Sequence, residues 1–79
     1  MTNEIATLGI KVENFEKIAE INELLHRFSN NIIARMGMPY EKRNIRLIHV
    51  VLDTNEKDVL YLSEKLNTLD GVTSAVMFL

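Results

Sequence analysis

Apolar and polar residues alternate at both ends of the chain, which is the pattern of a β-strand with one buried face. In the segment Glu4 to Val12, every second position from Ala6 onward is apolar, and the positions between them are mixed. In the segment Val72 to Leu79, one set of alternate positions is apolar except for Ser74. We therefore predict a first and a last strand over these residues. The positions predicted to face the core are Ala6, Leu8, Ile10, Val12, Val72, Ser74, Val76 and Phe78.

Two internal segments instead repeat their apolar residues at helical spacing. The first follows Asn14, a residue suited to capping a helix N-terminus, and is predicted to run to about Ser29. The second follows Thr54 or Asn55 and is predicted to stop at Gly71, because glycine adopts a left-handed C-cap without strain. The apolar stripes comprise Phe15, Ile18, Ile21, Leu25 and Phe28 in the first helix, and Val59, Leu62, Leu66 and Leu69 in the second.

The stretch Asn31 to Asp53 reads as two strands joined by a short charged turn, and therefore as a β-hairpin. A turn centred on Lys42 would place Arg35 opposite His49, since opposed residues in an antiparallel pair share a face. The same register would put Gly37 opposite Leu47 on that face, and Met36 and Met38 on the face that packs against the helices. Pro39 lacks a backbone donor and suits a strand end.

The element order is βαββαβ. Right-handed connections then give a four-stranded antiparallel sheet with two helices on one face, the ferredoxin-like α+β sandwich, as a single domain over residues 1–79. The strand after the turn should lie beside the first strand at the centre. The helices leave the other face open, where apolar residues gather, and such a patch is typical of an interface. We therefore expect a homo-oligomer, a dimer or a tetramer. The residues concerned are Ile5, Ile33, Leu47, Val51, Ala75 and Met77.

Composition narrows the classes of function. The 79 residues are 47% hydrophobic and 25% charged, with a net charge of −2, which is typical of a globular protein without an excess of positive charge for nucleic acid. The sequence has no cysteine, hence no disulfide and no thiolate metal site. No stretch has the roughly 20 apolar residues that span a bilayer, and the first residues do not resemble a secretory leader. We expect a soluble, cytoplasmic protein that binds neither membranes nor nucleic acid directly.

Arg35 and His49 are the candidate binding residues of the open face. An arginine can hold a small anion and a histidine can donate to it, with Gly9 on the next strand leaving room for a ligand. The alternative is that these polar groups form hydrogen bonds across an oligomer interface. The sequence contains no catalytic constellation, no metal site and no signature of a particular cofactor. A small enzyme using Arg35 and His49 as an acid-base pair, and a purely structural oligomer, remain the other hypotheses.

The segment ARMGMPY, which spans Ala34 to Tyr40, is the most specific part of a resemblance that covers nearly the whole chain. Together with IATLGIKVEN, INELLHRFSNNII, IRLIHVVLD and LDGVTSAV, it resembles the small proteins named iron-only hydrogenase system regulators. This family looks ACT-like and is related to the C-terminal regulatory domain of nickel-responsive repressors. The resemblance implies a non-enzymatic regulatory or accessory role, exerted on a protein partner or a small ligand. It adds Gly37, Pro39 and Tyr40 to Arg35 and His49 as candidate binding residues.

The sequence departs from the relatives that this resemblance suggests in two respects. The nickel-responsive domains bind metal through several histidines and a cysteine, whereas His49 is the only histidine on a predicted strand here. Amino-acid-binding ACT domains typically carry a glycine between the first strand and the first helix, where this chain has Glu13, Asn14 and Phe15. We therefore expect no nickel site, and any ligand must bind in another way.

Overall fold

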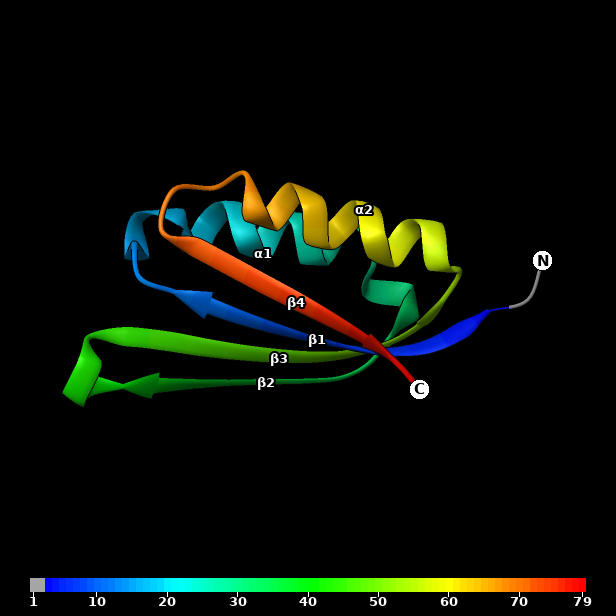
Figure 1. The fold of residues 1–79 in the computed structure, drawn as a ribbon, viewed down its shortest axis with the longest axis horizontal. Coiled ribbons are helices and arrows are strands. Elements are labelled where there is room, and N and C mark those ends of the chain that lie inside the picture. Colours follow the sequence, from blue (N-terminus) through cyan, green and yellow to red (C-terminus); the bar gives the residue numbers. More distant parts are fainter. Residues whose placement is uncertain (1–2) are drawn as a thin grey trace.

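A computed structural model describes residues 3–79 (Figure 1), and within them the chain forms four strands and two α-helices. The sheet is antiparallel throughout, with the order β2-β3-β1-β4. The predicted ferredoxin-like order, with the first and third strands at the centre, is confirmed. The bounds are β1 Glu4–Val12, α1 Ile18–His26, β2 Ile32–Tyr40, β3 Ile45–Thr54, α2 Glu56–Asn67 and β4 Val72–Phe78, with 3-10 turns η1 Phe15–Lys17, η2 Ser29–Asn31 and η3 Glu41–Arg43.

Both helices lie on one side of the sheet, and β2 is the strand furthest from them in Figure 1. The hydrophobic core fills the space between the helices and β1, β3 and β4. Leu8 and Leu62 are among its fully buried side chains, and burying one leucine contributes about 1.5–3 kcal/mol. In β2, by contrast, every residue from Ile33 to Tyr40 is exposed. No helix within residues 3–79 is long and apolar enough to cross a membrane.

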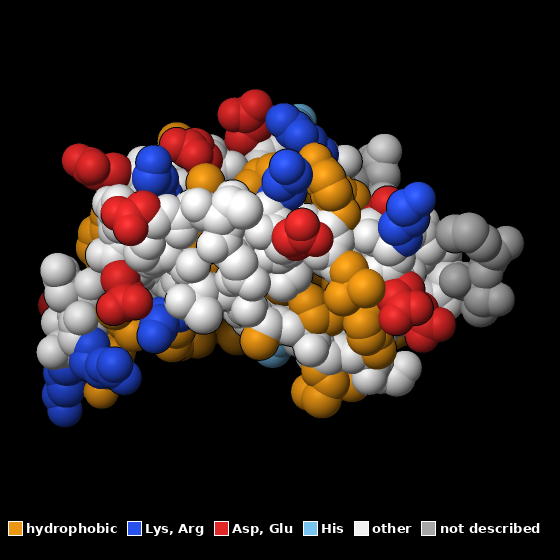
Figure 2. Space-filling model, turned by 45° about the horizontal axis from the view of Figure 1, so that its top comes forward, with side chains coloured by type: hydrophobic (Ala, Val, Ile, Leu, Met, Phe, Trp, Pro, Cys, Tyr) orange, Lys and Arg blue, Asp and Glu red, His pale blue; other side chains and the backbone are white. Residues whose placement is uncertain are grey.

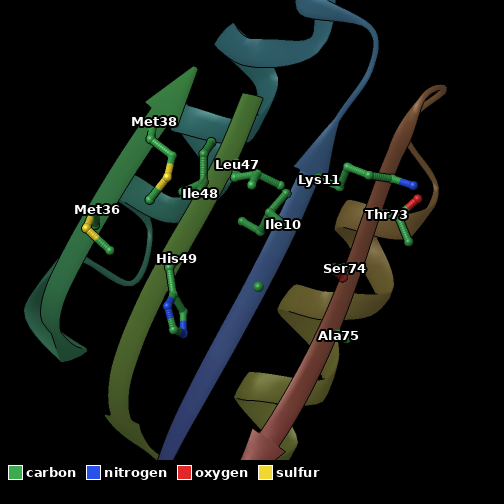
Figure 3. Close-up of a pocket in the computed structure, with 11 residues that line it drawn as sticks. Ile10, Lys11, Met36, Met38, Leu47, Ile48, His49, Thr73, Ser74 and Ala75 are labelled. Carbon is green, nitrogen blue, oxygen red and sulfur yellow. The ribbon is translucent and has the colours of Figure 1, made fainter. Parts of the chain in front are cut away.

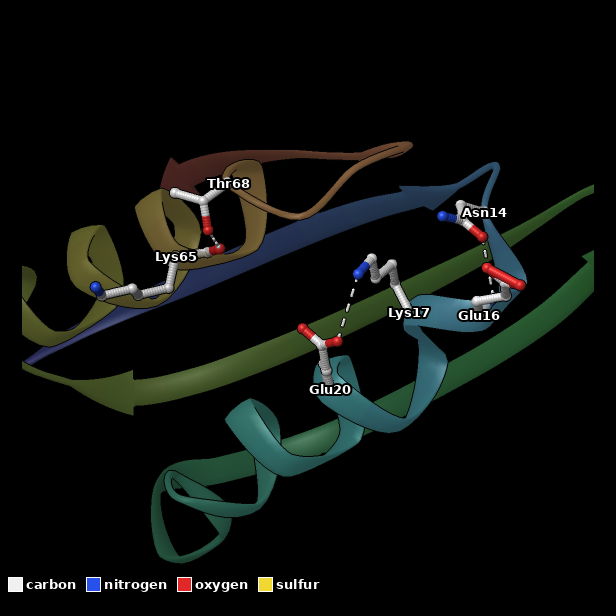
Figure 4. Close-up of polar contacts among 6 residues, drawn as sticks. All are labelled: Asn14, Glu16, Lys17, Glu20, Lys65 and Thr68. Carbon is white, nitrogen blue, oxygen red and sulfur yellow. Dashed lines mark hydrogen bonds and ion pairs between the residues drawn. The ribbon is translucent and has the colours of Figure 1, made fainter.

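The second helix starts as predicted, after Asn55. The first is shorter than predicted at both ends, because Asn14 caps the 3-10 turn η1 and α1 begins only at Ile18. The Oδ1 of Asn14 accepts a hydrogen bond from the backbone N–H of Glu16 at 3.1 Å (Figure 4), and Asn55 caps α2 in the same way through Asp58. The helix α1 ends at His26 rather than near Ser29. Phe28 leaves the helical region, with φ −108° and ψ 15°, and the chain tightens into η2. Its side chain still packs against the core, which explains why the apolar spacing continued.

The turns on the helix side are held by local polar contacts. Lys17 pairs with Glu20 at 3.5 Å, and the hydroxyl of Thr68 donates to the carbonyl oxygen of Lys65 at 2.6 Å where α2 ends (Figure 4). Gly71 has the predicted left-handed conformation, with φ 73°. It lies in the turn into β4, beyond the end of α2 at Asn67, and its carbonyl oxygen accepts from the backbone N–H of Glu13 at 2.7 Å.

The predicted register of the hairpin is wrong by one residue over most of its length. Ile32 lies opposite Leu52, as predicted, but the register shifts before Ala34, which lies opposite Val51. This shift is a β-bulge at Ile33, an extra residue that moves every later side chain of β2 to the other face.

The turn at the other end of the hairpin agrees with this shift. Tyr40 lies opposite Ile45, so the connection comprises residues 41–44, and Asn44 closes it in a left-handed conformation with φ 52°. The centre of the turn therefore falls after Lys42 and not on it. Met36 lies opposite His49, and Arg35 lies opposite Val50, whose side chain is buried beneath the helices.

Replacing Gly71 by alanine should destabilise the protein by about 1–3 kcal/mol, because a side chain is strained at positive φ. An added Cβ would also lie 2.7 Å from the Cβ of Asn14. Urea unfolding followed by circular dichroism measures the change. The control is Gly37→Ala, because a Cβ there meets nothing within 4 Å and the residue does not require positive φ. Equal stability of the two variants would contradict this account of the turn.

Candidate functional site

The open face of the sheet contains a hollow of about 450 Å³. Its floor is low at Gly9, which lies opposite His49 on β3 and Ala75 on β4. A Cβ at Gly9 would meet nothing within 4 Å, so the missing side chain itself provides room. Side chains from all four strands of the described sheet line the hollow, among them Met36, Met38, Leu47, His49 and Ala75 (Figure 3).

His49 is the polar group at the centre of this apolar hollow. Its Nε2 forms a hydrogen bond with the Oγ1 of Thr7 on the neighbouring strand β1. The contact restrains the ring on one side, and which atom donates depends on the tautomer. The other ring nitrogen belongs to an exposed side chain and can serve a ligand or a partner.

The side of the molecule formed by the helices has a different character. Figure 2 shows acidic and basic side chains interspersed there, with smaller groups of hydrophobic side chains and white surface of backbone and other side chains between them. Some form exposed pairs, such as Arg27 with Glu23 at 3.9 Å, and pairs of this kind contribute little stability. The open face, by contrast, contains the apolar hollow.

The structure divides the five predicted site residues between two surfaces. His49 lies on the open face, as predicted. Arg35, Gly37 and Pro39 face the helix side, opposite Val50, Ile48 and Arg46. Tyr40 lies at the end of β2 beside the turn and is 44% exposed.

The predicted pairing of Arg35 with His49 on one face is therefore wrong. The Nη2 of Arg35 instead donates to the Oδ1 of Asn22 on α1 at 2.6 Å. An acid-base pair of Arg35 and His49, as the enzyme hypothesis required, is not formed in this arrangement. The correction follows from the bulge at Ile33, which exchanges the two faces of β2.

The same shift explains which residues the sequence reasoning missed. Met36 and Met38 were predicted to fill the core, yet they are 55% and 44% exposed and line the hollow. Asn22 and Arg46 were not predicted to contribute to a site. Asn44 was the available sequence signal for the longer turn and its register, since asparagine tolerates the positive φ that closes such a turn.

Metal-binding residues do not gather in the part of the chain that the structure describes: residues 3–79 contain no group of three or more His, Asp or Glu placed to hold an ion. Buried side-chain polar atoms within those residues all have hydrogen-bond partners. The chemistry on offer is thus recognition by exposed surfaces.

Comparison with known proteins gives a consistent family and fold. The model of the TM1266-like family, described as "Iron-only hydrogenase system regulator, putative", matches residues 4–76. A solved structure of the uncharacterized protein TM1266 from Thermotoga maritima is 33% identical in sequence, with a TM-score of 0.92, and the match covers 98% of each chain. No curated protein matches the sequence.

More distant structures share the fold alone. The ACT domain from GTP pyrophosphokinase of Chlorobium tepidum has a TM-score of 0.79 at 22% identity, and the match covers 96% of this chain and 100% of that domain. The divalent ion tolerance protein CutA1 from Ehrlichia chaffeensis has a TM-score of 0.53 at 14% identity, with coverage of 100% and 84%. The predicted ACT-like, ferredoxin-like fold is confirmed by the first of these.

Replacing Thr7 by valine should release the ring of His49, because valine keeps the branched shape but has no hydroxyl. We expect the ¹⁵N resonance of Nε2 to shift, and the free energy of unfolding to fall by less than about 1 kcal/mol, since the bond is exposed. NMR of the histidine rings measures the shift. His26 on α1 is the internal control, and an unchanged His49 signal would contradict the contact.

Proposed function

The chain belongs to the TM1266-like family of iron-only hydrogenase system regulators, and we propose that it acts as a non-enzymatic regulatory module that assembles through its open sheet face. The observation that supports this proposal is the exposed apolar surface around the hollow. Met36 and Met77 are 55% and 59% exposed, and Leu47 is 38% exposed. Contiguous apolar surface of this kind is characteristic of interfaces.

A second copy of the chain is the occupant that fits this face in size. Strands rise about 3.3 Å per residue and lie about 4.8 Å apart, so a face of this sheet covers roughly 600 Å². Two stacked faces would bury on the order of 1,200 Å², the lower end of the range for stable interfaces. Because both copies present the same face, the assembly would be an isologous dimer or contain one.

Charge complementarity supports the same occupant. The open face carries Lys11, which also pairs with Glu13 at 3.7 Å, near one end of β1, and Asp53 at the opposite end of β3, beside Ile5. A two-fold axis lying across the strands would bring the lysine end of each copy over the aspartate end of the other. Opposite charges would then face each other at both ends, with the hollow between them.

The assembly gives His49 a role that suits a regulator. In a stacked dimer the two hollows would form one enclosed cavity, and His49 would be its polar contact for a small ligand or for the other copy. Enclosure strengthens a hydrogen bond to the ring, because the local dielectric constant falls. We propose His49 for this surface, and Arg35, Gly37, Pro39 and Tyr40 for contacts on the helix side and at the hairpin end.

Leu47→Glu should convert the assembled protein into a monomer, because it buries a charge at the centre of the proposed interface. The apparent dissociation constant should rise at least about 100-fold, which corresponds to about 2.7 kcal/mol. Native mass spectrometry and light scattering after size exclusion measure the subunit number.

The matched control is Leu60→Glu, the same substitution at a residue of α2 that is 48% exposed on the helix side. We expect this variant to assemble like the unmodified protein. The proposed interface would be overturned if the unmodified protein is a monomer even at high concentration, or if both variants lose assembly equally.

A further inference from the structure

A second pocket, of about 230 Å³, lies on the helix side of the sheet, between α1 and the strands β2 and β3. It exists because the helices leave β2 uncovered. The residues of the ARMGMPY segment that the corrected register turns to this side are Arg35, Gly37 and Pro39, and all line the pocket. The other lining residues are Ile18, Asn22, Met38, Arg46 and Ile48.

The charged side chains that line this pocket are two arginines and no carboxylate. Within residues 3–79, neither Arg35 nor Arg46 forms an ion pair. Two guanidinium groups that share a pocket repel each other, and an anion between them removes that repulsion. The pocket therefore has positive charge without a partner.

Neighbouring groups hold both arginines in place. Arg35 donates to Asn22 at 2.6 Å, and the guanidinium carbon of Arg46 lies 5.7 Å from the centre of the Phe15 ring. Cation-π contacts of this kind restrain a side chain in an exposed setting. Restraint before binding lowers the entropy cost of holding an anion.

Gly37 forms the floor of the pocket between the two arginines. It lies opposite Ile48, between Arg35 and Pro39 on β2, and a Cβ there would meet nothing within 4 Å. The backbone does not require glycine at this position, since φ is not positive. What the glycine contributes is space between the two arginines.

A neighbouring hollow of about 420 Å³ extends this space along α1. It also contacts Arg35 and Asn22, and it reaches His26 and Ser29. The pocket and this neighbouring cavity thus share Arg35, which would hold an anionic group. Together they offer a charged end and room for the body of a small molecule.

We infer that this pocket binds a small organic anion through a carboxylate or phosphate group held by Arg35 and Arg46. The fork of a guanidinium donates two parallel hydrogen bonds to either group. The apolar walls, Ile18 and Ile48 among them, favour an organic anion over a fully hydrated inorganic ion. Only the role of the ligand, that of an effector, rests on the proposed function. The binding itself does not depend on the proposed interface, because the pocket lies on the other side of the sheet from the open face.

The test is an NMR titration at constant ionic strength with three probes: inorganic phosphate, phenyl phosphate and benzoate. We expect saturable shifts of the Gly37 amide and of the Nε signals of Arg35 and Arg46, with an organic probe binding more tightly than inorganic phosphate. Saturation by phenyl phosphate alone assigns a phosphate group, and saturation by benzoate alone assigns a carboxylate. Saturation by both assigns the chemistry that they share.

Three variants and one control make the titration specific. Arg35→Gln and Arg46→Gln should each weaken binding at least about tenfold, since each removes a charge-assisted contact. Gly37→Val should abolish binding while the dispersion of the spectrum is retained, because valine suits a strand and fills the floor. Arg43→Gln removes the same charge from η3, outside the pocket, and should bind like the unmodified protein.

Absence of saturable shifts with every probe would overturn the inference, and so would equal weakening in Arg43→Gln, which would indicate attraction by net charge. Normal binding by Gly37→Val would also overturn it. The subunit number of the same samples separates this result from the proposed assembly. If the protein is a monomer and Arg35 shows saturable shifts, the proposed interface is refuted and the pocket is supported. If the protein is assembled and shows no saturable shifts, the pocket is refuted and the interface is supported.

Discussion

The register of β2 against β3 is the constraint on which both surfaces of this protein depend. Side chains alternate between the faces of a strand, so one extra residue exchanges every face beyond it. The bulge at Ile33 supplies that residue at one end of the hairpin. The left-handed Asn44 closes the turn at the other end in agreement with it. These two features place Met36 beside His49 and turn Arg35 toward α1.

A single edge strand thus serves two different chemistries. Its residues alternate between an apolar hollow on the open face and a cationic pocket on the helix side. This is feasible because no helix covers β2, whose residues from Ile33 to Tyr40 are all exposed. Stability comes from the other three strands of the described sheet and the helices, so β2 is free to carry residues that a core would reject.

The family and the fold agree, while the local chemistry of the loop after β1 differs from that expected of amino-acid-binding ACT domains. In this loop Asn14 caps η1 and packs where a side chain at Gly71 would have to lie. Glu13 donates its backbone N–H to the carbonyl oxygen of Gly71. The loop therefore joins the start of the first helix to the turn before β4. Its residues have a structural role, which directs the search for a ligand to the surfaces of β2.

The sequence alone determined the order of the elements, the central pair of strands, the core-facing positions of β1 and β4, and the cap Asn14, because these follow from local periodicity and local hydrogen bonds. It left Thr54 and Asn55 as alternatives for the second cap. It also predicted the apolar character of the open face. Only the tertiary structure decided the faces of Arg35, Met36, Gly37 and Met38. Each face of β2 carries apolar and other residues, so periodicity could not fix its register. A bulge leaves no clear pattern in the sequence. The hydrogen-bond partner of Arg35 is Asn22 on α1, which lies 13 residues earlier in the chain, so no local pattern indicates the contact.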